Sequence, residues 1–296
     1  MNSETQNPKI ANSLNAPALV SVIIPCYNHD KYVAKTLDSI IADTYPHKEI
    51  IIINDGSTDN SDLKIKSWLA ENKTGNMVTY LSRENKGICA SMNELIDLAK
   101  GKYILPLASD DCLYGNAIAK RVQVLEERLD KMVLLNDAMV IDNDDNIIMQ
   151  SSSTDYWKAD KDKYLNDDDI LASCIKAPRI AGPVIFYRSE VFNVIGKFPE
   201  GLLFEDWYFY QRAASLRLIL FVDFKVALYR VHGANFSGVN SPHALKIAKA
   251  TLKVYRLNFG VYPGLKFKFL GFNCYLRVLA WYVKLKFKSL FKQNRT

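Results

Sequence analysis

The stretch Leu105–Asp111, which reads LPLASDD, decides the fold prediction. Residues 103–107 form a strand-like run that leads into small residues and then into two adjacent carboxylates, Asp110 and Asp111. A buried strand that delivers acids at its carboxyl end places them where α/β sheets bind ligands. Neighbouring carboxylates repel each other, and a divalent cation such as Mn²⁺ or Mg²⁺ relieves that repulsion and bridges to phosphate oxygens. Alternatively, the two acids cap the next predicted helix, residues 113–129.

Strands and helices are predicted to alternate upstream of this stretch. Such alternation predicts a mainly parallel sheet with right-handed crossovers. The strand ends at Pro25, Asp55, Asn85 and Asp110 then share the carboxyl edge of the sheet and converge on one crevice. The pattern predicts strands at 20–24, 49–53, 78–81 and 103–107, and helices at 31–41, 61–70 and 88–98.

Three residues at this edge have both a binding and a plain structural interpretation. Asp55 could accept a hydrogen bond from a uracil ring or a ribose, or it is the acid of an ordinary Asp-Gly turn. Tyr27 could stack on a base or fill the edge of the core, and Lys86 could meet a phosphate or be a solvated loop charge. Neither GxGxxG nor GxxxxGK[ST] occurs, so a nucleotide would be held by acids and a metal.

Three segments of the chain are VSVIIPCYN (20–28), EIIIINDGSTDNS (49–61) and ENKGICASMNELIDLAKGKYILPLASDD (84–111). In this order and at this spacing, they resemble the nucleotide-binding half of family 2 glycosyltransferases, which have the GT-A fold. The resemblance extends over about residues 20–237. It implies that Asp55 contacts uracil, that Asp110, the first acid of a DxD-type motif, meets the ribose or the metal, and that Asp111 coordinates the metal. Asn54 stands where the family often has Asp.

The fold class implied by this resemblance is α/β, with a Rossmann-like, mainly parallel sheet flanked by helices. The nucleotide-sugar site is expected to include Pro25, Tyr27, Asn28, Lys86 and Gly87, together with Asp55 and Asp110. Residues 18–240 are expected to form the glycosyltransferase domain, with residues 18–111 as the nucleotide-binding half and 112–240 as the acceptor half.

The acceptor half is predicted to hold shorter elements. An Asp/Asn run at 142–146 could mimic a calcium loop, but it lacks the Gly and terminal Glu of an EF-hand, so a solvated hairpin turn is predicted. Residues 151–169 are expected to form a polar loop over the acceptor side. The pattern predicts helices at 113–129, 168–175 and 206–214, and strands at 132–135, 139–142, 182–187, 218–222 and 226–229.

Two acids, Glu205 and Asp206, open one of these helices. In the family that the chain resembles, such an ED motif supplies the general base. Asp206 is expected to take the proton of an acceptor hydroxyl as its oxygen attacks the anomeric carbon, which suits an inverting single displacement. Glu205 is expected to orient that base or to bind acceptor hydroxyls. The alternative is a pair of helix N-terminal acids favoured by the macrodipole, and Trp207 is expected to belong to the core.

The segment YRVHGANFS, residues 229–237, resembles the family's YRxHxxNxS segment. His232 is therefore expected to complete the metal shell or to contact the diphosphate. The alternative is a structural histidine with no ligand.

Charge is unevenly distributed along the chain. The chain has 38 Lys and Arg residues and 32 Asp and Glu residues. Residues 224–296 contain 14 of the basic residues and none of the acidic ones. An acidic body with a wholly basic end predicts that this end meets something anionic. Residues 1–17 read as a disordered lead without the apolar segment of a signal peptide, and the five cysteines share no metal-ligand spacing. These features predict a cytoplasmic protein.

Residues 241–296 are expected to form basic amphipathic helices. Between 244 and 259 apolar side chains alternate with lysines at helical spacing, and residues 265–292 mix aromatic, aliphatic and basic side chains. We expect this tail to contact the anionic inner face of the cytoplasmic membrane. The alternative is that the helices pack on the body and leave a solvated basic face. No nucleic-acid-reading module is recognised.

The sequence thus predicts a non-processive, metal-dependent, inverting glycosyltransferase. The expected donor is a UDP-sugar, and the expected acceptor is a saccharide carried on a polyprenyl diphosphate, as in cell-surface polysaccharide assembly. The alternative is a catalytically inactive nucleotide-sugar-binding or membrane-adaptor protein on the same fold.

Overall fold

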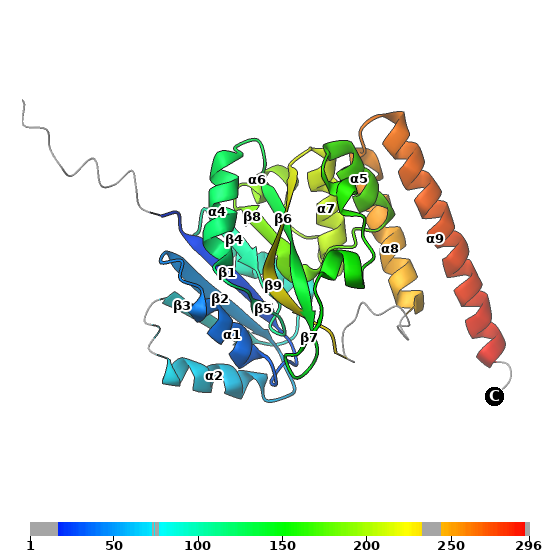
Figure 1. Cartoon of the computed structure of the whole chain (residues 1–296). Helices are drawn as coiled ribbons and strands as arrows, with labels where there is room; N and C mark the ends of the chain where they lie inside the picture. The colour runs from blue at the N-terminus through cyan, green and yellow to red at the C-terminus, as the bar shows by residue number, and fades with distance from the viewer. Residues whose placement is uncertain (1–16, 73, 75–76, 233–243, 294–296) are drawn as a thin grey trace, which may run out of the picture.

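The computed structural model describes residues 17–72, 74, 77–232 and 244–293 of the chain. Almost all of the predicted lead, and the end of the YRVHGANFS segment, lie outside these ranges. Within them, strands and helices alternate through the first half of the chain as predicted (Figure 1).

The strands of the described residues form one sheet in the order β3-β2-β1-β4-β8-β6-β9-β5, with β7 paired to β6. The pairings make β1, β2, β3, β4, β6 and β9 run in one direction, whereas β5, β7 and β8 are antiparallel to their neighbours. The carboxyl ends of the parallel strands therefore lie along one edge. The strands are β1 (Val20–Cys26), β2 (Lys48–Asp55), β3 (Val78–Arg83), β4 (Tyr103–Pro106), β5 (Cys112–Leu113), β6 (Val133–Ile141), β7 (Ile147–Met149), β8 (Ile185–Arg188) and β9 (Ile219–Arg230).

Helices cover both faces of this sheet, which explains the unbroken apolar runs in its strands. In β2, Ile50 and Ile52 pack in the cluster that holds side chains of α1, α2 and α4, whereas Ile51 and Ile53 pack in the cluster of α3, α5 and α7. The helices of the body are α1 (Val33–Ala42), α2 (Ser61–Glu71), α3 (Ile88–Leu98), α4 (Ala117–Glu127), α5 (Asp167–Lys176), α6 (Val191–Ile195) and α7 (Glu205–Ser215).

The elements after residue 111 differ from the predicted ones at several boundaries. The two short strands predicted within 132–142 are one strand, β6, with register irregularities around Asp137, and the two predicted within 218–229 are one strand, β9. The helix predicted from residue 113 begins at Ala117, because Cys112 and Leu113 pair with β9 as β5. The strand predicted from residue 182 begins as a 3₁₀ turn, Gly182–Val184. The predicted loop 151–169 contains a π turn, Ser152–Tyr156, and a 3₁₀ turn, Lys161–Tyr164.

The C-terminal helices, α8 (Ala244–Asn258) and α9 (Gly264–Gln293), pack on the body. The Tyr255 hydroxyl of α8 donates to the carbonyl of Ile175 at 2.7 Å, and the Tyr262 hydroxyl donates to Gln211 Oε1 at 2.6 Å. Both tyrosines belong to the same buried cluster as α5 and α7. None of the described helices combines the length and the apolarity needed to cross a membrane.

We expect Gly101→Ala to lower the free energy of unfolding by about 1–3 kcal/mol. A Cβ at this position would lie 2.7 Å from the backbone nitrogen of Ser21, between β1 and the start of β4, where backbone cannot yield. Gly260→Ala is the matched control, because its Cβ would meet nothing within 4 Å. Urea unfolding of both variants tests this, and equal stabilities would contradict it.

Candidate active site

The loops that follow β1 and β2 are tied together at the carboxyl edge of the sheet. The Asn28 N–H donates to the Ser57 hydroxyl at 3.0 Å, and Asn28 Oδ1 accepts from the Thr58 N–H at 2.8 Å. Asn28 adopts a φ of 57°, which asparagine tolerates better than most residues. Pro25 lies within β1 opposite Ile53, just before this junction. The side chain of Tyr27 is 48% exposed, so it stands at the surface rather than in the core.

The loop that follows β3 closes against the end of β2 through Asp55. The Asp55 carboxylate accepts from the Lys86 N–H at 2.8 Å and from the Gly87 N–H at 2.9 Å, and it pairs with the Arg83 guanidinium. Gly56 has a φ of +67°, and a Cβ there would lie 2.6 Å from the backbone nitrogen of Asn85, so only glycine fits this close approach. Asp55 therefore shapes the loop that begins α3, while the Lys86 side chain remains exposed.

A buried arginine joins the loop after β4 to the end of β9. The Arg230 N–H donates to Asp111 Oδ1 at 2.8 Å, and Arg230 Nε donates to the carbonyl of Asp110 at 2.7 Å. The Arg230 guanidinium also donates to the carbonyl of Asp142 at 2.8 Å and lies over the Tyr32 ring at 4.8 Å. Because β5 pairs with β9 just beyond these residues, the acids of the LPLASDD stretch are held beside the end of a strand more than 100 residues later.

The turn at 142–146 is a hairpin turn between β6 and β7, as predicted, but it contacts the site region rather than solvent alone. Asp145 pairs with Lys35 and, at 2.6 Å, with Arg230, and Asn143 accepts from the Tyr32 hydroxyl at 2.8 Å. The turn thus fixes the start of α1 against the end of β9.

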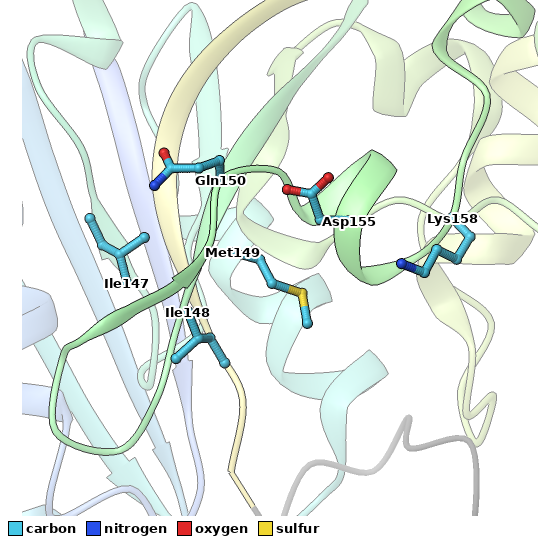
Figure 2. Close-up of a pocket in the computed structure, with 6 residues that line it drawn as sticks. All are labelled: Ile147, Ile148, Met149, Gln150, Asp155 and Lys158. Atoms are coloured by element: carbon cyan, nitrogen blue, oxygen red, sulfur yellow. The ribbon is translucent and has the colours of Figure 1, made fainter.

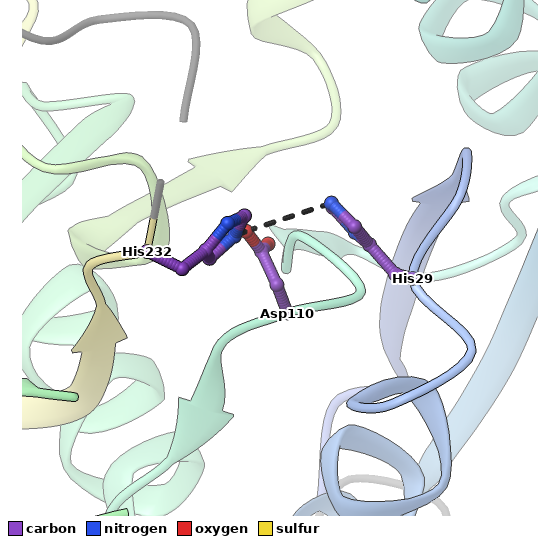
Figure 3. A group of neighbouring side chains, drawn as sticks. All are labelled: His29, Asp110 and His232. Atoms are coloured by element: carbon purple, nitrogen blue, oxygen red, sulfur yellow. Dashed lines mark hydrogen bonds and ion pairs between the residues drawn. The ribbon is translucent and has the colours of Figure 1, made fainter. Parts of the chain in front are cut away.

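Three side chains converge beside this arginine (Figure 3). His232 Nε2 lies 2.9 Å and His29 Nε2 lies 3.7 Å from Asp110 Oδ2, and one ligand atom from each of the three residues lies within 4.8 Å of the others. Donors that share one ion at about 2.1 Å lie roughly 3–4.3 Å apart. Two imidazoles and a carboxylate are also a donor set that transition metals accept. The distances from Asp110 to the two histidines, 2.9 and 3.7 Å, match this spacing, so the residues fit a divalent metal.

Neighbouring groups hold both histidines in place. His29 Nδ1 lies 2.8 Å from the Ser109 hydroxyl, and the His232 ring stacks on Tyr32 with centroids 5.2 Å apart. A ring nitrogen held in this way leaves the other nitrogen to face Asp110.

Asp111 lies outside this group of three side chains, and its predicted part in the metal site stays a prediction. Its carboxylate is 2% exposed and turns toward the Arg230 N–H. Burial, and then repulsion from Asp110, raise the pKa of Asp111 well above the usual value. Burial alone would also raise the pKa of Asp110, but the hydrogen bond with His232 and the charge of His29 lower it. The pKa values of the two adjacent acids therefore shift in opposite directions, and Asp110 is the acid that faces the histidines. Neither caps α4, whose N-cap residue is Asn116.

Glu205 and Asp206 begin α7, as predicted, and both side chains are largely buried. Burial, followed by the charge of Asp206, raises the pKa of Glu205 to about 8, and burial also raises the pKa of Asp206. The Trp207 N–H donates to Asp206 Oδ1 at 2.6 Å. The Trp207 ring packs against Tyr255 at 5.6 Å, as expected for a core side chain.

The start of α3 links this acidic pair to the carboxyl edge of the sheet. Cys89 stands two residues after Gly87, the N-cap of α3, and its thiol donates to the carbonyl of Leu202 at 3.1 Å. Burial raises the pKa of Cys89 to about 11, and the negative charges of Glu205 and Asp206 add to that effect. The acids therefore lie beside the loop that Asp55 shapes.

An open hollow of about 520 Å³ lies between β7 and the π turn that follows it (Figure 2). It contains none of the residues predicted for the site. Its lining is Ile147, Ile148, Met149, Gln150, Asp155 and Lys158.

Two residues that the sequence reasoning did not assign are central to the observed geometry. His29 directly follows the predicted Tyr27-Asn28 pair, and Arg230 stands within the YRVHGANFS segment. A histidine at the end of a strand on the same edge as Asp110 was the available signal for the first. Arg230 carried no signal of its own, since a basic residue at a strand end is usually solvated.

Comparison with known proteins defines the class. The family described as Glycosyl transferase family 2 matches residues 21–196. An uncharacterised glycosyltransferase of Rickettsia prowazekii is 31% identical over 222 residues, which are 73% of this chain and 65% of the relative. The glycosyltransferase GlyG of Streptococcus pneumoniae is 29% identical over 223 residues, covering 72% of this chain and 70% of GlyG. The chain belongs to glycosyltransferase family 2, and it spans just under two thirds of the length of the Rickettsia relative.

Solved structures agree with the predicted GT-A fold. The mannosyltransferase PcManGT of Pyrobaculum calidifontis, solved with GDP-Man and Mn²⁺, superposes with a TM-score of 0.64 at 15% identity, over 95% of this chain and 80% of that one. Residues 1–349 of Staphylococcus aureus TarS, solved with UDP, superpose with a TM-score of 0.53 at 19% identity, over 80% and 65% of the two chains. The α/β fold class is thereby confirmed.

We expect Glu205→Gln to flatten the pH dependence of stability. A carboxyl group whose pKa is raised from 4.5 to about 8 binds more protons in the folded than in the unfolded state across that window. Its contribution to stability is therefore present below about pH 4.5 and is lost as the pH rises toward 8.

Between pH 5 and pH 8 the parent should lose about 3–4 kcal/mol more of its free energy of unfolding than the variant does. Urea titrations across this range measure the difference. Parallel pH profiles for parent and variant would contradict the raised pKa.

Proposed function

We propose that this chain is a metal-dependent, inverting glycosyltransferase that moves a sugar from a UDP-linked donor to a saccharide acceptor. The observation that carries the proposal is the convergence of Asp110, His29 and His232 at the carboxyl edge of the sheet. A nucleotide diphosphate needs positive charge beside it, and the described residues offer a metal-ligand set at the edge where α/β sheets bind ligands.

The donor would lie along the ends of β1, β2 and β4. A carboxylate offers about four acceptor positions, and Asp55 has one left after the Lys86 N–H, the Gly87 N–H and Arg83. We propose that a uracil N3–H uses that position and that the half-exposed Tyr27 stacks on the base. TarS was solved with UDP and PcManGT with GDP-Man, so the fold accommodates more than one nucleotide.

A divalent ion would be held by Asp110, His232 and His29. When bound, such an ion supplies positive charge that stabilises the departing diphosphate. The donor set, with two imidazoles beside a single carboxylate, favours Mn²⁺ over Mg²⁺, because Mg²⁺ prefers oxygen ligands.

Asp206 would act as the general base. The acceptor hydroxyl gives its proton to the Asp206 carboxylate, the acceptor oxygen forms a bond to the anomeric carbon, and the bond from that carbon to the diphosphate oxygen breaks. UDP leaves with the electron pair, and one displacement inverts the anomeric centre. The raised pKa values of the acidic pair support this role, since a base is most effective when its pKa lies near the working pH. Glu205 would hold a proton beside it and orient it.

The acceptor is proposed to be a saccharide linked to a polyprenyl diphosphate at the inner face of the cytoplasmic membrane, in cell-surface polysaccharide assembly. The acid-free, basic C-terminal helices support that location. A catalytically inactive nucleotide-sugar-binding protein on the same fold is the second candidate. Calorimetry with UDP detects both proteins, whereas release of UDP from a UDP-sugar detects only the enzyme.

We expect His29→Ala, His232→Ala and Asp110→Asn each to weaken Mn²⁺ binding by about tenfold to a hundredfold, because each removes one donor. Titration calorimetry and the Mn²⁺ EPR signal measure this without any turnover. His47→Ala is the matched control, since His47 is exposed and contacts the carbonyl of Pro17. Tight Mn²⁺ binding by all three variants would remove the proposed metal centre.

We expect Asp206→Asn to lower the rate of sugar transfer by about 10²–10⁴ because the amide cannot take the acceptor proton. Its affinity for UDP should match that of the parent. Asp130→Asn, which changes an exposed acid before β6, should leave the rate unchanged. A fully active Asp206→Asn enzyme would refute the assignment of the base.

A further inference from the structure

Helix α9 presents two different faces. On the inner face Phe267 and Cys274 are buried, and Gly271 lies so close to the Tyr262 ring that no side chain would fit between them. Lys266 reaches Asp168 of α5 at 3.4 Å, and the Tyr275 hydroxyl accepts from Arg256 of α8 at 3.0 Å. The side chains of the inner face therefore pack against and bond to the body of the protein.

The opposite face of α9 carries a stripe of exposed apolar side chains, here called the outer stripe. Its members are separated by steps of four, three, four, seven and four residues, which keeps them on one side of a helix with 3.6 residues per turn. The exposed fractions are 86% for Leu265, 68% for Phe269, 46% for Phe272, 43% for Leu276, 42% for Val283 and 58% for Phe287. Single exposed apolar residues are ordinary, but a continuous row of them marks an interaction surface.

Basic side chains border the outer stripe on both sides. Helical geometry places Lys268 and Lys286 along one border, and Lys266, Arg277 and Lys284 along the other. All five side chains are exposed, although Lys266 also reaches Asp168, and residues 224–296 themselves contain no acid.

We propose that the outer stripe of α9 docks on an anionic lipid bilayer, with the helix axis parallel to the membrane plane. The proposal rests on the membrane location proposed above and adds the surface that makes the contact. An apolar row bordered by cations matches the boundary between acyl chains and anionic headgroups. A second copy of the chain on the same stripe would bring two rows of cations face to face, which opposes self-association.

Docking through this face would also orient the active site. The Tyr262 hydroxyl, at the start of α9, donates to Gln211 of α7, and Arg212 of α7 donates to Asn258 at 2.9 Å. Helix α7 begins with Glu205 and Asp206. In Figure 1, α9 descends along the side of the molecule toward the end where β9 terminates. A bilayer bound to α9 would therefore lie at a fixed position and orientation relative to the acidic pair.

Flotation of the full-length protein with vesicles tests the proposal. The parent should float with phosphatidylcholine vesicles that contain phosphatidylglycerol, and it should float at least tenfold less with phosphatidylcholine alone. The double variant Phe269→Glu/Phe272→Glu should lose about tenfold or more of its partition into the anionic vesicles, because it places acids in the stripe. Lys268→Glu/Lys284→Glu should also lose binding, and most strongly at low salt.

The matched control is Leu129→Glu/Leu165→Glu, which changes two side chains that are 74% and 73% exposed outside α9. It should float like the parent. Equal flotation of the parent and the Phe269→Glu/Phe272→Glu variant would overturn the proposal. So would sedimentation of the parent as a dimer that this variant converts to a monomer. UDP release in solution, measured on the same samples, reports separately on the proposed enzyme activity.

Discussion

The candidate site depends on one buried contact, the pairing of Arg230 with the loop that carries Asp110 and Asp111. The Arg230 side chain is fully buried, and its guanidinium bonds to the carbonyls of Asp110 and Asp142 and pairs with Asp145. Loss of one partner of a buried charge costs about 3–5 kcal/mol, so the arrangement tolerates little movement. It holds the ends of β4, β6 and β9 in one place.

This contact separates the roles of two neighbouring acids. Asp111 is bound by the Arg230 N–H in the interior, and burial disfavours its charge. Asp110 keeps its charge because histidines on both sides stabilise it. The two adjacent acids thereby differ in protonation: burial favours the neutral form of Asp111, while Asp110 stays charged beside the histidines.

At the acidic pair, Glu205 and Asp206, burial raises pKa values instead of separating the roles of two acids. Glu205 and Asp206 sit at the start of α7 next to the first turn of α3, where loss of solvent raises the pKa values of both. The same helix α7 is bonded to α8 and to the start of α9, so the catalytic candidates and the outer stripe belong to one packed unit. The C-terminal helices therefore combine the two arrangements considered from the sequence. They pack on the body, and the face that they leave exposed is apolar with basic borders rather than simply basic.

The sequence alone determined the alternation of strands and helices, the common edge of the strand ends and the acid-free C-terminus, because hydrophobic periodicity and charge are local properties of the chain. It also determined the family, through VSVIIPCYN, the NDG turn and the two acidic stretches. Only the tertiary structure decided which of Asp110 and Asp111 faces the histidines, that His29 lies beside His232, and that β6 and β9 are each one strand. The orientation of the two acids depends on the pairing of β5 with β9 across more than 100 residues of chain, and the two long strands depend on their pairing with each other. No local pattern encodes the direction in which a side chain points after such a pairing.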